Sequence, residues 1–360
     1  MPTNLAKTKY QLLLITIILV VFGLFMVYNA SVIDAFRDFG DKFYYFKLQS
    51  KWALLSVLLM LLVSRINPQK LFFIAAPLWF ISILLLILVL IPGIGNKYLG
   101  ARRWIGIGSI RFQPSEVAKL SITIYLSAIL SKRSQLEKLI PHLLLATGLI
   151  MMQPDLGTTI VIILTCLITY YLSGGEFKRM ILISAVIFLI GIVLILSSPY
   201  RKSRLLTFLD PGRDPQGGSY HIRQALIAFG NGGFFGVGLG QSRQKYQYLP
   251  EVTTDSIFAI VGEELGFVGS ASVILAIFWL ILLCLKISQN APTSFQKLLS
   301  YGMTSWIAIQ SLINLGAILG AVPLTGIPLP LISYGGSSLA VTLISIGIIL
   351  STGKHEQNRR

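Results

Sequence analysis

Residues 256–286 read SIFAIVGEELGFVGSASVILAIFWLILLCLK. An apolar run of about 18 residues or more is long enough to cross the hydrocarbon core of a membrane as a helix. This run has that length although two acidic residues, Glu263 and Glu264, lie near its beginning. A spanning helix satisfies its own backbone hydrogen bonds, which is why lipid favours this structure for such a run. The run therefore predicts a transmembrane helix whose charged groups need partners inside the protein.

The rest of the chain has the same apolar character. Of its 360 residues, 54% are hydrophobic and only 12% are charged, which is too few charges to cover a soluble protein of this size. The other long apolar runs cover residues 12–28, 48–63, 71–91, 115–130, 139–152, 156–172, 180–196, 298–319 and 337–351. These runs predict an all-α, polytopic integral membrane protein with about ten transmembrane helices, arranged as a single membrane domain over residues 1–360.

The charges in the loops predict the orientation. An even number of spans puts both termini on the same side of the membrane. The short loops on that side each carry Lys or Arg and few acidic residues, and they cover residues 64–70, 131–138, 173–179 and 287–297. By the positive-inside rule this side is cytoplasmic, so residues 197–255 form one large extracytoplasmic loop.

The loops on the extracytoplasmic side are also basic, which the positive-inside rule does not explain. Their Lys and Arg residues are Lys97, Arg102, Arg103, Arg111, Arg201, Lys202, Arg204, Arg213, Arg223, Arg243 and Lys245. Contact with anionic lipid headgroups is one explanation, and it is worth about 1 kcal/mol per charge near the surface. An anionic ligand such as a diphosphate is the other, because arginine offers phosphate two parallel hydrogen bonds.

A short amphipathic helix is expected within the large loop, near residues 219–229. Ser219 is a suitable N-cap for it. Its apolar stripe falls at i, i+3, i+4 and i+7 and consists of Ile222, Ala225, Leu226 and Phe229. A helix of this kind lies in the plane of the membrane interface.

Asp255 ends the loop directly before the apolar run. We expect it in the first turn of the helix, where the helix dipole favours an anion, as either a cap or a group for chemistry at the membrane surface. Glu263 and Glu264 lie roughly 12–14 Å deeper, at 1.5 Å per residue. A carboxylate at that depth needs a cation or a polar cavity, so we expect these two residues to pair within the protein.

Three further features lie at the membrane edges. Glu116 and Lys119 are three residues apart on one helix and can pair. Asp155 lies in the turn QPDL between two short spans. We expect these three residues to hold the bundle together or to shape a cavity. The segment PLTGIPLPLISYGGSS, residues 323–338, is too apolar for an exposed loop and is typical of a re-entrant segment that lines a cavity.

Five stretches, in order along the chain, carry a resemblance to a known family. They are GARRWI at residues 100–105, QPSEVAK at 113–119, QPDLGT at 153–158, GLGQSRQKYQYLPEVTTDSIFAIVGEELG at 238–266 and GIPLPLISYGGSS at 326–338. Over nearly its whole length the chain resembles the SEDS family (shape, elongation, division and sporulation proteins), typified by FtsW and RodA. The pair Gln244 and Lys245 before YLPE makes the resemblance closer to FtsW than to RodA.

This resemblance implies a peptidoglycan glycosyltransferase of the bacterial cytoplasmic (inner) membrane. Such proteins polymerise lipid II into glycan strands at the outer face of the membrane, with inversion at the anomeric carbon and release of undecaprenyl diphosphate. The implied partners are a class B penicillin-binding protein and other membrane proteins of division or elongation, and no nucleic acid. Either cell division or elongation is compatible with the resemblance.

The resemblance also implies roles for residues. The family's essential Asp corresponds to Asp255, which we expect to act as the catalytic base or to hold a divalent cation, Mg²⁺ or Mn²⁺, against the diphosphate. The candidate substrate-binding residues are Arg243, Lys245, Arg223, Arg103, Glu251, Ser333 and Ser337. The family usually has His two residues before the Asp. This chain has Thr253 there, which argues against a mechanism that needs that His as a proton relay.

Two other functions share the gross features of this sequence. A lipid II flippase is also polytopic, with basic loops and carboxylates inside the membrane. Against it, the charges cluster on one face, no repeated halves are visible, and the buried charges reach only part of the way across. The third alternative is a non-catalytic scaffold that presents a partner enzyme. A polymer made by this chain while the partner's own site is disabled would argue against that alternative.

Overall fold

The computed structural model describes residues 2–98, 101–107, 110–132, 137, 139–197, 199–210, 219–246 and 249–352. In these residues the chain forms twelve helices and one three-stranded sheet. Ten of the helices overlap the ten expected runs, one helix to each run. They are α1 (Pro2–Phe39), α2 (Tyr44–Val63), α3 (Lys70–Leu88), α4 (Pro114–Leu130), α5 (Ile140–Met152), α6 (Leu156–Leu172), α7 (Phe177–Leu196), α10 (Ile257–Gln289), α11 (Ser294–Ile318) and α12 (Gly336–Ser351).

The outward faces of these helices are apolar. By length and composition alone, four helices among the described residues can cross a membrane: Leu5–Phe39, Tyr44–Val63, Lys70–Leu88 and Ile257–Gln289. Large side chains such as Phe73, Phe80 and Phe188 are 77%, 70% and 69% exposed. Exposing this much apolar surface to water is unfavourable, whereas the hydrocarbon of a bilayer covers it without that cost. The expected all-α, polytopic membrane fold is therefore confirmed.

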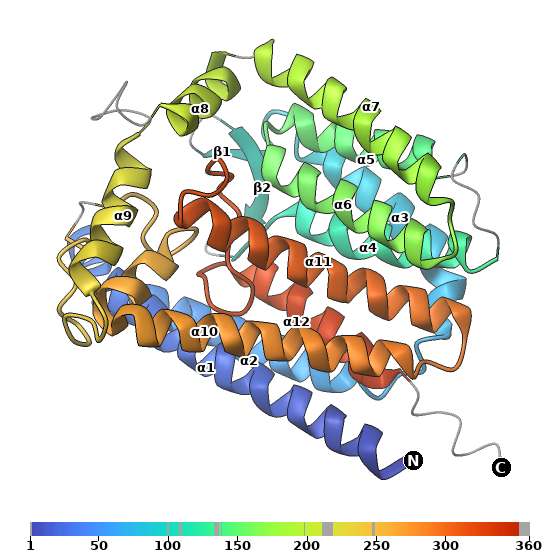
Figure 1. Cartoon of the computed structure of the whole chain (residues 1–360), viewed down its shortest axis with the longest axis horizontal. Helices are drawn as coiled ribbons and strands as arrows, with labels where there is room; N and C mark the ends of the chain where they lie inside the picture. Colours follow the sequence, from blue (N-terminus) through green and yellow to red (C-terminus); the bar gives the residue numbers. More distant parts are fainter. Residues whose placement is uncertain are drawn as a thin grey trace.

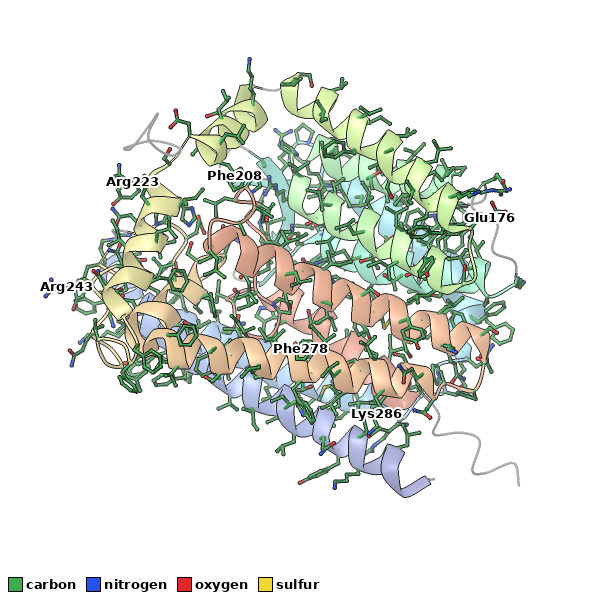
Figure 2. All side chains as sticks on the ribbon, in the orientation of Figure 1. Glu176, Phe208, Arg223, Arg243, Phe278 and Lys286 are labelled. Atoms are coloured by element: carbon green, nitrogen blue, oxygen red, sulfur yellow. The ribbon has the colours of Figure 1, made fainter. Side chains whose placement is uncertain are left out.

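The helices run between two ends of the bundle, as Figure 1 shows. α1 begins and α12 ends at the same end, where Nζ of Lys9 donates to the backbone oxygen of Thr352. Figure 2 places Lys286 toward this end and Arg223 and Arg243 at the other. α10 begins at that second end, which we call the Asp255 end.

α1 is much longer than the expected span of residues 12–28. The apolar run stops where polar residues begin, but polar residues do not stop a helix outside the hydrocarbon core. The helix ends at Phe39 because Gly40 adopts φ +68°, the left-handed conformation that commonly terminates helices. The apolar run thus indicates the membrane-embedded part of α1 and not the length of the helix.

One helix and a small sheet were not expected. α8 (Pro199–Leu209) lies within the segment predicted as the large loop. The antiparallel sheet consists of β1 (Gly95–Tyr98), β2 (Ala101–Ile107) and β3 (Ile110–Phe112), in that order, between α3 and α4. Strands this short carry too little alternation of polar and apolar residues to be recognised in a sequence. The bounds of the large loop at residues 197–255 and the single domain over the whole chain stay predictions.

Where the amphipathic helix was expected, the chain forms α9 (Tyr220–Gly232), which packs on α10. The ring centroids of Phe229 on α9 and Phe258 on α10 are 5.8 Å apart. One detail of the prediction is wrong, since the hydroxyl of Ser219 makes no capping hydrogen bond. Of the predicted apolar stripe, Ile222 and Ala225 are buried against the protein, while Leu226 is 47% exposed. The place of α9 in the membrane interface stays a prediction.

The chain between α11 and α12 is buried although it is not helical, as expected for a re-entrant segment. Ile327, Leu329 and Ile332 are each 3% exposed or less. The segment runs directly against α1, since a Cβ added at Gly23 would lie 2.5 Å from the backbone oxygen of Leu331. Irregular backbone at this depth must find its hydrogen bonds within the protein. We call residues 319–335 the re-entrant segment.

Candidate active site

Asp255 lies in a tight turn directly ahead of α10. The expected place in the first turn of the helix is wrong, because the helix begins only at Ile257. The turn is closed by a hydrogen bond of 3.3 Å from the backbone nitrogen of Ser256 to the backbone oxygen of Glu251. Glu251 itself has φ +49°. Such a backbone costs a non-glycine residue about 1–2 kcal/mol, and strain of this kind is often found at functional sites.

The re-entrant segment closes over Asp255. The backbone nitrogen of Tyr334 donates to the backbone oxygen of Thr253, at 2.8 Å. At Gly326, which has φ +71°, an added Cβ would lie 3.8 Å from Oδ2 of Asp255. The segment therefore passes the carboxylate as bare backbone. Asp255 is only 8% exposed, so the carboxylate expected at the membrane surface is largely enclosed by protein.

A second carboxylate lies beside Asp255. The hydroxyl of Thr254 donates to Oε2 of Glu251 at 2.9 Å and lies 3.4 Å from Oδ1 of Asp255. Among the described residues, no group of three or more His, Cys, Asp or Glu side chains is placed to hold a metal ion. Among these described residues, the side chains that could bind a cation at Asp255 include the carboxylates of Asp255 and Glu251 and the hydroxyl of Thr254. Mg²⁺ is commonly bound in this way, with water and substrate phosphates as its other ligands.

α10 is interrupted at Gly266, which has φ +64° and ψ −159°. Residues 233–238, in the loop after α9, replace the missing helical hydrogen bonds. The four bonds run from Phe267 to Gly233, from Val268 to Phe234, from Val237 to Glu263 and from Gly238 to Glu264, at 3.0, 3.2, 3.0 and 3.1 Å. In an uninterrupted helix the nitrogen of Phe267 would bond to the carbonyl of Glu263. The nitrogen of Val268 would likewise bond to the carbonyl of Glu264. We call residues 233–238 the inserted loop, because they enter the hydrogen-bond ladder of α10.

Glu263 holds the chain that follows the inserted loop. Its carboxylate accepts from the hydroxyl of Ser242 and from the backbone nitrogens of Arg243 and Gln244, both at 3.2 Å. The residue is 1% exposed. Several donors of this kind stabilise a buried carboxylate without a cation. Glu263 thus fixes the path of this loop on α10.

Glu264 forms a buried ion pair with Lys245. The distance from Nζ to Oε1 is 3.1 Å, and neither side chain is more than 4% exposed. Lys245 also donates to Oδ1 of Asn29, at 2.9 Å, and to the backbone oxygen of Gly240, at 2.6 Å. Asn29 in turn donates to Glu264, which joins α1 to the loop. We call Asn29, Lys245 and Glu264 the buried triad.

The basic residues expected to bind a diphosphate therefore differ in their surroundings. An ammonium group has three protons, and the three protons of Lys245 face three acceptors inside the protein. Arg223 and Arg243 are exposed, and Figure 2 shows both pointing outward at the Asp255 end. Arg213 lies outside the described residues, as do the side chains of Lys97, Arg201 and Arg204. Substrate binding by Lys245 stays a prediction, one that the enclosure of its ammonium group does not favour.

Arg103 and Asp155 meet at the turn between α5 and α6. Arg103 of β2 donates from Nε to the backbone oxygen of Gln153, at 2.8 Å, and from Nη2 to that of Pro154. Asp155 is the N-cap of α6, since its carboxylate accepts from the backbone nitrogen and the hydroxyl of Thr158, at 3.0 and 2.8 Å. The sheet is thereby fastened to the bundle. The substrate-binding role expected for Arg103 stays a prediction.

Glu116 and Lys119 pair inside the bundle at 2.8 Å, and each is 2% exposed. Nζ of Lys119 also donates to Oε1 of Gln310 on α11, at 2.8 Å. It lies 5.0 Å from the ring centroid of Trp306, within the range of a cation–π interaction. The pair therefore joins α4 to α11.

The two serines expected to bind substrate are both buried, at 5% exposed each. The hydroxyl of Ser333 accepts from the backbone nitrogen of Leu329, at 2.8 Å, and so closes a turn within the re-entrant segment. Ser337 lies in the first turn of α12, and its hydroxyl has no hydrogen-bond partner among the described residues. Substrate binding by these serines and by the exposed Glu251 stays a prediction.

Three more side chains reach the surroundings of Asp255, and none of them was predicted from the sequence. His221 of α9 places Nε2 against the hydroxyl of Ser256. Asn314 of α11 donates to the backbone oxygen of Asp255, and Gln310 donates to the re-entrant segment. All three come from helices other than α10. The spacing of Gln310 and Asn314 is a weak signal, because it predicts only that the two amides share one face of a helix.

The inserted loop predicts that Gly236→Ala destabilises the protein. Gly236 has φ +85°, and an added Cβ would lie 2.1 Å from the backbone oxygen of Glu264. Both the conformation and the space require glycine, so we expect the free energy of unfolding to fall by about 2–4 kcal/mol. The midpoint of thermal unfolding in detergent measures this. Gly230→Ala is the control, since nothing lies within 4 Å of its added Cβ. An unchanged midpoint for Gly236→Ala would contradict the insertion.

The chain matches a family model described as "Cell cycle protein", for FtsW, RodA and SpoVE, over residues 10–358. Stage V sporulation protein E of Bacillus subtilis (strain 168) is 39% identical over an alignment of 366 positions, which covers 99% of this chain and 100% of that protein. "Probable peptidoglycan glycosyltransferase FtsW" of Trichlorobacter lovleyi is 37% identical, and the match covers 97% of this chain and 94% of that protein.

Solved structures have the same fold. One chain belongs to a structure described as "Structural coordination of polymerization and crosslinking by a peptidoglycan synthase complex". It matches with a TM-score of 0.79 at 28% identity, over 95% of this chain and 96% of that one. The rod shape determining protein RodA of Thermus thermophilus gives a TM-score of 0.69 at 27% identity, over 95% of each chain. By sequence along nearly its whole length, and by fold, this protein belongs to the SEDS family of FtsW, RodA and SpoVE.

Proposed function

We propose that this protein is a peptidoglycan glycosyltransferase that polymerises lipid II into glycan strands, and that Asp255 is the centre of its reaction. Relatives named as probable peptidoglycan glycosyltransferases match nearly the whole chain. The observation that carries the choice of Asp255 is its enclosure. The carboxylate is 8% exposed and lies between a turn with left-handed backbone and the bare backbone of Gly326.

The reaction joins the 4-hydroxyl of one lipid-linked sugar to the anomeric carbon of another. The hydroxyl oxygen forms the new bond while the bond from the anomeric carbon to the diphosphate oxygen breaks. Undecaprenyl diphosphate leaves with that electron pair, and attack from the opposite face inverts the anomeric carbon. Asp255 takes the proton of the hydroxyl as the general base.

The departing diphosphate carries negative charge that needs stabilisation at the same end of the molecule. Arg223 and Arg243 present exposed guanidinium groups there (Figure 2). Guanidinium groups bind phosphate oxygens through pairs of parallel hydrogen bonds. We therefore assign diphosphate binding first to these two arginines, ahead of Lys245, which the buried triad already engages.

Arg243→Gln is expected to weaken substrate binding more than the chemical step. The loss of one charge-assisted hydrogen bond to phosphate costs about 1.5 kcal/mol or more, which corresponds to a factor of about ten. We expect KM for lipid II to rise about tenfold in a polymerisation assay, with kcat within about threefold of the wild type. Arg65→Gln, in the loop between α2 and α3, is the control and should change neither constant. An unchanged KM for Arg243→Gln would remove Arg243 from the binding site.

A divalent cation, Mg²⁺ or Mn²⁺, fits the same place. Asp255 and Glu251, with the hydroxyl of Thr254 between them, are the residues that would hold it. When bound, it would supply positive charge against the diphosphate of the substrate. The oxygen ligands are of the kind that both ions prefer.

The same proposal includes an orientation and partners. The Asp255 end faces the outer side of the bacterial cytoplasmic membrane, and both termini lie in the cytoplasm. The basic residues of the short loops at the other end support this orientation. The partners are a class B penicillin-binding protein and other membrane proteins of cell division or elongation. A similar solved chain comes from a structure described as a peptidoglycan synthase complex, which supports the first of these.

Reconstitution separates polymerisation from transport. The purified protein in liposomes receives fluorescent lipid II, with and without Mg²⁺ or Mn²⁺ and without any partner. The proposal predicts a ladder of glycan products on a gel. Movement of fluorescent lipid II between the leaflets with no ladder, from folded protein that binds lipid II, would instead indicate a flippase.

A further inference from the structure

Two amides on one face of α11 join the surroundings of Asp255 to the core of the bundle. Gln310 and Asn314 are one helical turn apart, and they are 0% and 1% exposed. We propose that Asn314, supported by Gln310, is a positioning residue that holds Asp255 in register with the re-entrant segment. This inference rests on the role proposed for Asp255.

Asn314 donates twice from one nitrogen. Nδ2 lies 2.9 Å from the backbone oxygen of Asp255 and 2.7 Å from the backbone oxygen of Ile327. These two carbonyls belong to the two pieces of chain that enclose the carboxylate. Ile327 directly follows Gly326, where an added Cβ would lie 3.8 Å from Oδ2 of Asp255. A single side chain thus fixes the residue that carries the carboxylate relative to the backbone that covers it.

Gln310 repeats the arrangement one turn earlier on α11. Its Nε2 donates to the backbone oxygen of Pro328, at 2.9 Å. Its Oε1 accepts from Nζ of Lys119 and from Nε1 of Trp306, at 2.8 and 2.9 Å. Since Lys119 is paired with Glu116, a buried ion pair on α4 is linked to the re-entrant segment through one amide. The ion pair thus fixes the side chain of Gln310, which in turn holds the re-entrant segment.

The position of a general base decides its efficiency. A carboxylate acts on a hydroxyl only within hydrogen-bond reach, and a misplacement of about 1 Å can lower a rate by about 100-fold. Asn314 bonds to the backbone of Asp255 and not to its carboxylate. Its loss should therefore slow the chemical step through geometry, while the groups that bind lipid II stay in place.

Asn314→Asp removes both N–H groups while the size of the side chain is kept, and Asn314→Leu, measured beside it, removes them without adding a buried charge. In the polymerisation assay we expect kcat to fall about 10- to 100-fold, with KM for lipid II within about threefold of the wild type. We also expect faster hydrogen exchange at the amide of Tyr334, which donates to Thr253 across the same boundary. Ser311→Ala is the matched control. Ser311 is 2% exposed on the same helix and donates to Ile307 within α11, so all three quantities should be unchanged.

A second variant and a reference variant make the test decisive. Gln310→Glu keeps the acceptor used by Lys119 and loses the donor to Pro328. It replaces Asn314→Asp in the test if that variant does not fold. We expect kcat to fall about 3- to 10-fold, with the same unchanged KM and the same faster exchange at Tyr334. Asp255→Asn is measured alongside. If Asp255→Asn is inactive while Asn314→Asp has normal kcat and normal exchange at Tyr334, the positioning role of Asn314 is overturned. The proposed role of Asp255 then stands.

Two other outcomes would also decide the question. Activity in Asp255→Asn would overturn the role of Asp255 itself, and the positioning of that residue with it. Lower kcat in Asn314→Asp together with faster exchange throughout the helices would show a general loss of stability. That result would overturn positioning, because a positioning residue should loosen only the re-entrant segment and the turn before α10.

Discussion

Asp255→Asn is expected to lower the rate of lipid II polymerisation by about 100- to 10,000-fold while the fold is kept. An amide cannot accept the proton of the attacking hydroxyl, and a general base contributes about 10²- to 10⁴-fold to a rate. The new side chain has the same size, so it fits the same space beside Gly326. The hydrogen bond from Asn314 also remains, because it goes to the backbone oxygen. The rate of glycan formation by purified protein and the midpoint of thermal unfolding measure the two effects.

Glu251→Gln separates the two roles considered for Asp255. If Asp255 acts as a base alone, removing the neighbouring charge should leave the rate within about threefold of the wild type. If both carboxylates hold a divalent cation, the variant should need a higher concentration of Mg²⁺ or Mn²⁺ for half-maximal rate. A rate for Asp255→Asn within tenfold of the wild type would contradict both roles.

Lys245→Met is expected to be the most destabilising of these substitutions, by about 3–5 kcal/mol in the free energy of unfolding. Methionine fills similar space but leaves Glu264 as a buried charge without its cation. Asn29 also loses the donor that Oδ1 accepts from. The midpoint of thermal unfolding and the yield of monodisperse protein in detergent should both fall. Arg243→Gln, in the same loop but exposed, should leave the midpoint unchanged.

A double substitution tests whether the broken ion pair causes the loss of stability in Lys245→Met. Lys245→Met with Glu264→Gln removes both charges, so the uncompensated charge disappears. We expect the double variant to be more stable than Lys245→Met by about 1.5 kcal/mol or more, and Glu264→Gln alone completes the double-mutant cycle that gives the coupling energy. If Lys245→Met is as stable as the wild type and raises KM for lipid II, the residue faces the substrate and the buried triad is wrong.

The sequence predicted those interactions whose partners lie close together in the chain. The ten long helices follow from apolar runs, which are local. Glu116 and Lys119 form a pair because they are neighbours on one helix face, and their spacing alone predicts it. Asp155 was expected at the turn between two short spans, and it is the cap of α6 there. In each case the interaction lies within a few residues.

Partners that are distant in the chain were not predictable. Lys245 was expected to meet a diphosphate, yet its partner Asn29 is 216 residues away. Its inward path depends on the inserted loop, and that loop depends on the break in α10 at Gly266. Most donors to Glu263 are backbone nitrogens, which every residue except proline carries, so no side-chain pattern marks them. For Arg103 the sequence likewise indicates only a positive charge. The position of β2 in the sheet determines that this side chain donates to the backbone oxygen of Gln153.

Whether Asp255 of this chain makes the polymer is decided by the product that the purified protein forms on its own. Wild type and Asp255→Asn are each given lipid II and a divalent cation, with no transpeptidase present. We predict a ladder of glycan strands from the wild type and none from Asp255→Asn, although both proteins fold and bind lipid II. Equal ladders from the two proteins, or no ladder from a folded wild type that binds lipid II, would contradict the proposed function.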